Sequence, residues 1–91
     1  MSLRFVAQRG EWNKELETVR FPAFDGEKPV MCAVSLEALE DLAEKINLTP
    51  DQCVAAFEKH RRVIEQKASA LYDSGRVRAD GVVLVKASRI L

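Results

Sequence analysis

The sequence lacks a long apolar run. Its longest apolar stretch is Gly81–Val85, whereas a helix that crosses a bilayer needs roughly 20 consecutive apolar residues. The opening segment Met1–Arg9 also lacks the apolar core of about 7 to 15 residues that a secretory signal peptide carries. We therefore expect no membrane-spanning segment and a cytoplasmic protein.

Cysteine and histidine are scarce. Cys32 and Cys53 each fall inside a strand or helix pattern, and a reducing compartment keeps such residues as thiols, so we expect no disulfide. Together with His60 they offer three ligands at wide spacing, whereas a structural zinc site takes about four at short paired spacings. Cys53 and His60 lie about 10.5 Å apart along a helix, which is too far for a catalytic hydrogen bond.

Motifs for enzymatic chemistry are also missing. The glycines are isolated from one another, so neither the dinucleotide-binding pattern nor the phosphate-binding loop is present. A Ser-His-Asp triad would need His60, which lies inside a helical pattern and away from any strained turn. We therefore expect no cofactor, no metal and no enzymatic activity.

What the chain does contain is the composition of an ordinary globular domain. It has 91 residues, of which 47% are hydrophobic and 31% charged. A chain of this length buries about 60 to 65% of the surface that its unfolded form exposes. No internal repeat or linker divides it, so we expect residues 1–91 to form a single small domain.

An alternating pattern predicts an antiparallel β-hairpin. Residues 18–24 and 30–34 both alternate between apolar and other side chains, with Asp25-Gly26 between them. A two-residue turn would pair Phe21 with Val30, and a four-residue loop would pair Phe21 with Cys32. Both lengths keep the apolar side chains on one face of the sheet.

The segment before the hairpin has a weaker pattern. Leu3-Arg4-Phe5 is expected to form a short edge strand. Residues Gln8 to Glu17 are polar and without a clear period, so we expect a loop that holds Trp12 against the body of the protein.

Two amphipathic helices are expected after the hairpin. Ser35 is placed to cap the first, whose apolar positions keep the helical period as far as Ile46. Thr49-Pro50-Asp51-Gln52 predicts a helix start with a capping box. The second helix then continues for about 24 residues to Asp73, roughly 36 Å, and Gly75 supplies its stop.

The polar side of the first helix carries acidic residues in pairs. Glu37 with Asp41, and Glu40 with Glu44, place like charges four residues apart on one helix face. Each pair costs a few tenths of a kcal/mol. A nearby basic partner would relieve this repulsion.

The tail and the hairpin together predict the fold class. Arg76–Lys86 forms either a second tight hairpin or one strand preceded by a loop. We expect a two-layer α+β fold: an antiparallel hairpin, two helices with the second one long, and C-terminal strand or strands that complete a small sheet. The helices cover one sheet face, and the other face presents Thr18, Arg20, Met31 and Ala33, with Val83 and Val85 if Val82 and Leu84 point inward.

A series of mostly packing residues follows a recognisable order along nearly the whole chain: Leu3-Arg4-Phe5, Trp12-Asn13, Val19-Arg20-Phe21, Asp25-Gly26, Val30 to Val34 leading into Ala38-Leu39, Phe57, Ile64 and Ala68. This order resembles that of a bacterial family catalogued as domain-of-unknown-function family 1488. The family carries no established activity, cofactor or catalytic residue, so the resemblance implies a fold and leaves the function open.

Charge is divided between the two parts of the chain although the net charge is +0. Residues 1–57 hold 6 basic and 10 acidic side chains, and residues 58–91 hold 8 basic and 4 acidic ones. Arg61 falls by helical angle inside the apolar stripe, so it needs a partner. We expect an ion pair with Glu58, Glu65 or the acidic first helix; the alternative is a basic site for phosphate or an acidic partner.

Two functions follow from these patterns. The first is a small non-enzymatic interaction or regulatory domain that binds a protein partner or itself through the sheet face around Arg20, Met31 and Ala33. The alternative is a nucleic-acid-binding accessory domain; a net charge near zero gives no long-range attraction to nucleic acid, so it is not favoured. The alternative uses Lys59, Arg62, Arg76 and Arg78, although solubility alone also explains Arg20, Arg76 and Arg78.

Overall fold

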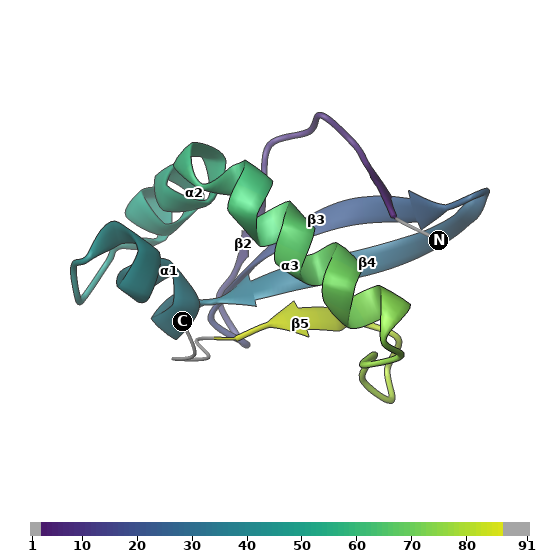
Figure 1. Ribbon diagram of the computed structural model, residues 1–91. Coiled ribbons are helices and arrows are strands. Elements are labelled where there is room, and N and C mark those ends of the chain that lie inside the picture. The colour runs from purple at the N-terminus through teal and green to yellow at the C-terminus, as the bar shows by residue number, and fades with distance from the viewer. Residues whose placement is uncertain (1–2, 87–91) are drawn as a thin grey trace.

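The computed structural model describes residues 3–86, which form a mixed α/β fold with a five-stranded open sheet and three helices (Figure 1). In chain order the elements are β1 (Arg4–Phe5), β2 (Glu11–Asn13), β3 (Thr18–Asp25), β4 (Lys28–Ser35), α1 (Leu36–Ala43), α2 (Pro50–Lys59), α3 (Arg61–Asp73) and β5 (Val83–Val85).

The hairpin of β3 and β4 is the centre of the sheet. Its antiparallel register pairs Phe21 with Cys32, as predicted for a four-residue loop, but the predicted loop length is wrong because the ladder continues to the end of the hairpin. The last pair is Asp25 with Lys28, so the connection is the two-residue turn Gly26-Glu27. Gly26 has a φ of 63°, a conformation that glycine adopts without steric cost.

Two short strands line the free edge of β3. The predicted edge strand is confirmed, because β1 pairs with β3 and places Phe5 opposite Ala23. The loop predicted for Gln8–Glu17 is only partly correct, because β2 lies within it and also pairs with β3. Trp12 stands opposite the buried Val19 and packs against the core, so a three-residue ladder holds this aromatic side chain.

The C-terminal segment contributes one strand. β5 pairs in parallel with β4, an arrangement that requires a crossover connection, which the helices between the two strands provide. The register sets Val83 opposite Cys32 and Val85 opposite Val34, so both valines face inward and are buried. The expectation that Val83 and Val85 could line the outer face is therefore wrong.

The first helix is shorter than its apolar pattern predicted. Ser35 caps α1, because its Oγ accepts a hydrogen bond from the Ala38 N–H at 3.1 Å. The helix ends at Ala43, where Glu44 takes a left-handed conformation with a φ of 58°. Ile46 consequently lies outside the helix and is 77% exposed, although its spacing matched the buried positions.

The long second helix predicted from the sequence is two consecutive helices in the structure. The capping box at Thr49 and Gln52 is confirmed, but the helix breaks at His60, whose ψ is 21°. A straight helix of this length would be about 36 Å long, as long as the whole molecule at 35 Å. The break lets α2 pack on β2 and β3 while α3 packs on β5.

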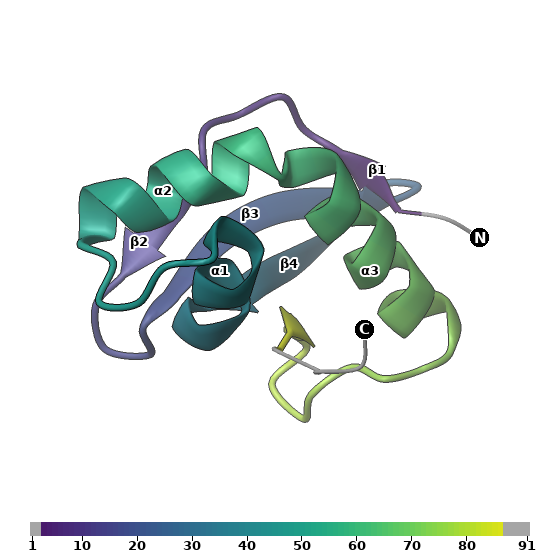
Figure 2. The same cartoon turned by 60° about the vertical axis from the view of Figure 1, so that its left-hand side comes forward.

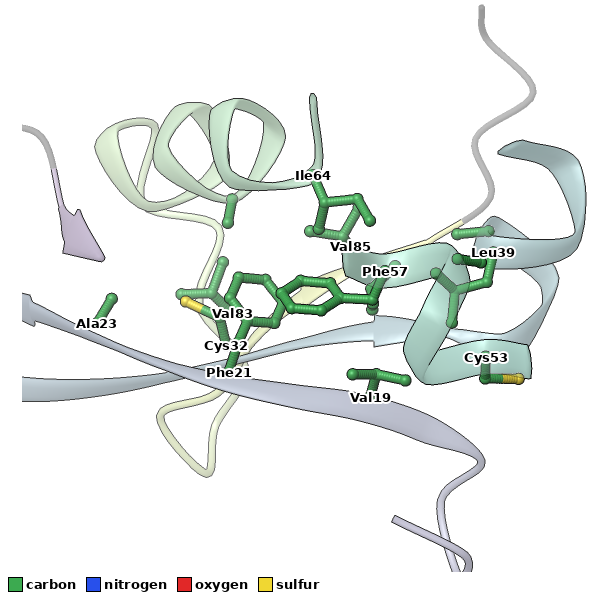
Figure 3. Packing of buried hydrophobic residues seen from close by; sticks show 14 of the residues in the cluster. Val19, Phe21, Ala23, Cys32, Leu39, Cys53, Phe57, Ile64, Val83 and Val85 are labelled. Atoms are coloured by element: carbon green, nitrogen blue, oxygen red, sulfur yellow. The ribbon is translucent and has the colours of Figure 1, made fainter. Parts of the chain in front are cut away.

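All three helices lie on one face of the sheet (Figure 2). Val19, Phe21 and Cys32 point from the strands toward Phe57 and Ile64 on the helices (Figure 3). The Phe21 and Phe57 rings are 4.8 Å apart between centroids. This inner face is the hydrophobic core, so the two-layer prediction holds and the opposite face carries no helix among residues 3–86.

Candidate interaction surface

The register of the strands defines the side of the sheet that no helix covers, which we call the outer face. Arg20 stands opposite Ala33, and Pro22 stands opposite Met31. Cross-strand partners project to the same side, and they alternate with the buried core residues. The outer face therefore includes Thr18, Arg20, Pro22, Phe24, Pro29, Met31, Ala33, Ser35 and, through its pairing with Ala33, Leu84. At its edge lie Arg4, Glu11 and Asn13, the partners of Phe24, Arg20 and Thr18.

The predicted residues of the outer face differ in their exposure. Met31 is 38% exposed and Arg20 is half-buried, so both present side-chain surface to a partner. Ala33 lies on this face as predicted but is only 3% exposed. The ring of Phe24 is covered on one side by Arg4, whose guanidinium carbon is 5.2 Å from the ring centroid.

Two buried polar atoms on the outer face have no hydrogen-bond partner in the described chain. They are Thr18 Oγ1 and Arg20 Nε, two residues apart on β3. A buried polar atom without a partner costs about 1–3 kcal/mol. Native proteins rarely retain such atoms without a reason.

At one end of the outer face lies a hollow of about 990 Å³, which we call the acidic groove. One wall is the polar side of α1, and the floor includes Thr18, which is 6% exposed. In residues 3–86 no ion pair neutralises Glu37, Asp41 or Glu44. The groove is lined by Leu16, Thr18, Ser35, Glu37, Glu40, Asp41, Glu44, Lys45, Ile46, Arg78, Leu84 and Lys86.

The four basic residues proposed for nucleic acid do not share one hollow. Arg76 and Arg78 follow α3 and line a hollow of about 560 Å³ together with Lys67 and Lys86. Lys59 ends α2, whereas Arg62 lies in the first turn of α3 and lines another hollow beside Glu65 and Asp73. Arg78 is further engaged by Asp80 at 3.4 Å.

Arg61 forms ion pairs with Glu58 and Glu65, which is the structural role predicted for it. Its Nε lies 2.8 Å from Glu65, and its Nη1 lies 3.1 Å from Glu58. Its Nη2 donates to the Val6 carbonyl at 2.7 Å, and the guanidinium lies 4.9 Å from the Phe57 ring centroid. Because every nitrogen has a partner, Arg61 ties the N-terminal segment to the break between α2 and α3.

The two thiols are buried and free of any disulfide. Burial raises the pKa of the Cys32 thiol to about 12, and the Glu65 charge adds to the shift. Burial also raises the pKa of Cys53, with smaller contributions from Glu40 and Glu17. Residues 3–86 contain no group of three His, Cys, Asp or Glu side chains that could hold a metal ion.

One side-chain hydrogen bond was not predicted from the sequence. The Tyr72 hydroxyl at the end of α3 donates to the carboxylate of Asp25, the last residue of β3 before the hairpin turn. This hydrogen bond raises the pKa of Tyr72, with burial and the Asp25 and Asp73 charges adding to it. Residues 47 positions apart carry no local signal of such a contact.

Comparisons with known proteins agree with this description. The family model "Protein of unknown function (DUF1488)" matches residues 3–85. A crystal structure of a protein of unknown function from that family, from Shewanella loihica PV-4, superposes with a TM-score of 0.84 at 26% identity. The alignment covers 92% of this chain and 91% of that one. Curated proteins gave no match, and no helix within residues 3–86 is long and apolar enough to span a membrane.

Proposed function

Since this chain belongs to the DUF1488 family, whose function is not established, we propose a function from its geometry: it is a small protein-interaction domain that binds a partner through the outer face. The carrying observation is that this face joins apolar side chains, Met31 among them, to buried polar atoms without partners on Thr18 and Arg20. A partner that covers Met31 and forms hydrogen bonds with Thr18 and Arg20 accounts for both features.

The domain acts by binding rather than by catalysis, and in the cytoplasm. Both parts belong to the same proposal. Support for the first is that the two thiols are buried with raised pKa values, so neither is an activated nucleophile. A reducing compartment suits two free cysteines in a small domain.

A matched pair of variants tests the outer face. Met31 on the sheet is 38% exposed, and Val63 on α3 is 42% exposed, so both offer similar apolar surface on opposite layers. Met31→Asp is expected to reduce capture of the partner from bacterial extract at least tenfold, whereas Val63→Asp leaves capture within twofold. Equal capture by both variants would overturn the proposal.

Two further measurements complete this test. The milder Met31→Gln keeps the side-chain length, so its loss of capture at an unchanged melting temperature separates binding from misfolding. Sedimentation of the full chain at micromolar concentration distinguishes a second copy of the chain from another protein. A strict monomer that still captures a partner assigns the outer face to another protein.

Nucleic-acid binding is a second candidate, supported by one observation. Arg76 and Arg78 share their hollow with Lys67 and Lys86, and no acidic residue lines it. Phosphate contacts make binding fall as salt rises. Retention of mixed DNA and RNA pools by the protein at low salt, and loss of that retention in Arg76→Gln, would favour this function. No retention at low salt would rule it out.

A further inference from the structure

We propose that the acidic groove binds a short basic peptide segment of the partner protein, with an apolar side chain at each end of that segment. This inference rests on the proposed function, because it gives the chemistry of the partner that the outer face receives. Three observations carry it: the charge of α1, the hydroxyl of Thr18, and the positions of Leu16 and Ile46.

The charge of α1 lacks compensation. Glu37, Glu40 and Asp41 lie on the helix and Glu44 follows as its C-cap, with no basic residue in the last turn. Asp41 and Glu44 are near the C-terminal end, where the helix dipole disfavours negative charge. Like charges four residues apart add repulsion. Guanidinium or ammonium groups placed along this wall relieve both effects.

The other charges of the groove leave this wall unneutralised. Glu40 accepts a hydrogen bond from the Asn47 N–H, which orients its carboxylate without removing its charge. Of the three basic residues that line the groove, Arg78 is held by Asp80, and Lys45 follows the C-cap Glu44 but forms no ion pair within residues 3–86. Lys86 follows β5, whose parallel register places it near Ser35, the N-cap of α1, and it forms no ion pair in the described part of the chain.

The second observation is Thr18, which points to a ligand independently of the acidic residues. Its cross-strand partner Ser35 already uses its hydroxyl to cap α1. The Thr18 hydroxyl has no partner although its residue is 94% buried, since only 6% is exposed. A peptide group that enters the groove and displaces a neighbouring side chain supplies the missing hydrogen bond.

The third observation gives the spacing of the segment. Leu16 is 59% exposed and lies at the start of α1, where the neighbouring Glu17 carbonyl accepts from the Leu36 N–H at 3.0 Å. Ile46 is 77% exposed and lies just past the other end of α1. An eight-residue helix is about 12 Å long, which an extended peptide spans in about four residues. The segment therefore has apolar residues about four positions apart with basic residues between them.

The size of the outer face also requires contact beyond the sheet. Its two central strands have eight residues each and β5 has three, so together they present about 300 Å². A stable interface buries about 800 Å² on each partner. Because Thr18, Ser35 and Leu84 belong to both the outer face and the groove, a partner gains the remaining area by continuing along α1.

A titration with designed peptides tests this site on the isotope-labelled full chain by NMR. The probe is a capped Gly-Leu-Arg-Arg-Arg-Leu-Gly peptide, and the matched control replaces its three arginines by glutamates. A third peptide replaces both leucines by serine. We expect the arginine probe to shift the amide signals of Leu16, Thr18 and Glu37, with at least tenfold weaker binding of the glutamate peptide and at least threefold weaker binding of the serine peptide.

Variants of the chain locate the site. Glu37→Gln combined with Asp41→Asn removes two charges at nearly unchanged shape and is expected to weaken the arginine probe at least tenfold. Glu27→Gln removes an exposed acid from the hairpin turn, at the far end of β3 and β4, and should leave affinity within twofold. Thr18→Val should weaken the probe at least threefold without lowering the melting temperature.

Several results would overturn the inference. They are equal binding of the arginine and glutamate peptides, no shifts at millimolar probe, or shifts confined to the centre of the sheet around Met31. Groove shifts that depend on protein concentration without any peptide would identify a second copy as the occupant and also contradict it. The Met31→Asp capture experiment uses a residue outside the groove, so it judges the proposed function separately.

Discussion

The two faces of the same β-hairpin differ in how completely their side chains are satisfied. On the inner face Val19, Phe21 and Cys32 are fully buried against the helices. On the outer face Thr18 and Arg20, from the same strand, hold buried polar atoms without partners. The inner face thus specifies the fold by packing, whereas the outer face retains unmet hydrogen-bonding capacity, which a partner can use.

The largest expected effect tests the inner face. Phe57 is fully buried and lies against Phe21, so Phe57→Ala should lower the free energy of unfolding by about 3–5 kcal/mol. Met31→Ala on the outer face is the control and should cost about 0.5 kcal/mol. Urea denaturation of both variants measures the difference. Similar losses would mean that the outer face is also a packed surface.

The next effect concerns the ion-pair cluster that borders the inner face. Arg61→Met keeps the side-chain stem over Phe57 but removes the hydrogen bonds to Glu58, Glu65 and the Val6 carbonyl. We expect a loss of about 2 kcal/mol, the typical value for hydrogen bonds to charged groups. Arg61→Lys should recover only part of it, because ammonium lacks the planar fork. Full recovery by lysine would show that charge alone is required.

A pH titration measures the burial of the inner face through Cys32. The pKa of the Cys32 thiol is about 12 in the folded protein and 9.0 when unperturbed, so the thiol stays protonated to a higher pH in the folded state than in the unfolded state. The resulting stability is complete below pH 9 and is lost as pH rises toward 12, at about 1.4 kcal/mol per pH unit. Comparison with Cys32→Ala by denaturation isolates this slope. Native labelling of Cys32 at pH 8 as fast as in denaturant would contradict its burial.

The smallest effect has the opposite sign and concerns the outer face. Thr18→Val removes the hydroxyl without a partner and keeps the shape, so the free energy of unfolding should rise by about 1 kcal/mol. Thr49→Val is the matched control, since it removes a hydroxyl that caps α2, and should cost about 1 kcal/mol. Thermal denaturation of both variants shows which substitution raises the stability and which lowers it. A loss of stability on Thr18→Val would mean that its hydroxyl has a structural partner.

Local signals predicted much of this fold. The capping box at Thr49 and the cap at Ser35 depend only on neighbouring residues, and both form. Alternation restricted the hairpin to registers that keep Phe21 inside, and one of these is found. The break at His60 was not predicted, because neither proline nor glycine marks it in the sequence.

Contacts between distant segments limited the prediction of the site. Arg20 and Met31 were assigned to one face from strand alternation alone, and they lie there. The acidic groove needs Leu16, Thr18 and α1 to meet, which the sequence signalled only through the repulsion between Glu37 and Asp41. β5 pairs in parallel with β4, and this pairing turns Val83 and Val85 inward. The pairing depends on a crossover through three helices, which no local sequence pattern predicts.

Photo-crosslinking in the cells that naturally express this chain tests the central claim most directly. The photoreactive residue p-benzoylphenylalanine is placed at Met31 in one sample and at Val63 in another, positions of similar exposure on the two layers. The outer face as a partner-binding surface predicts a discrete crosslinked product from position 31 and none from position 63. Products from position 63 alone, or equal products from both positions, would contradict it.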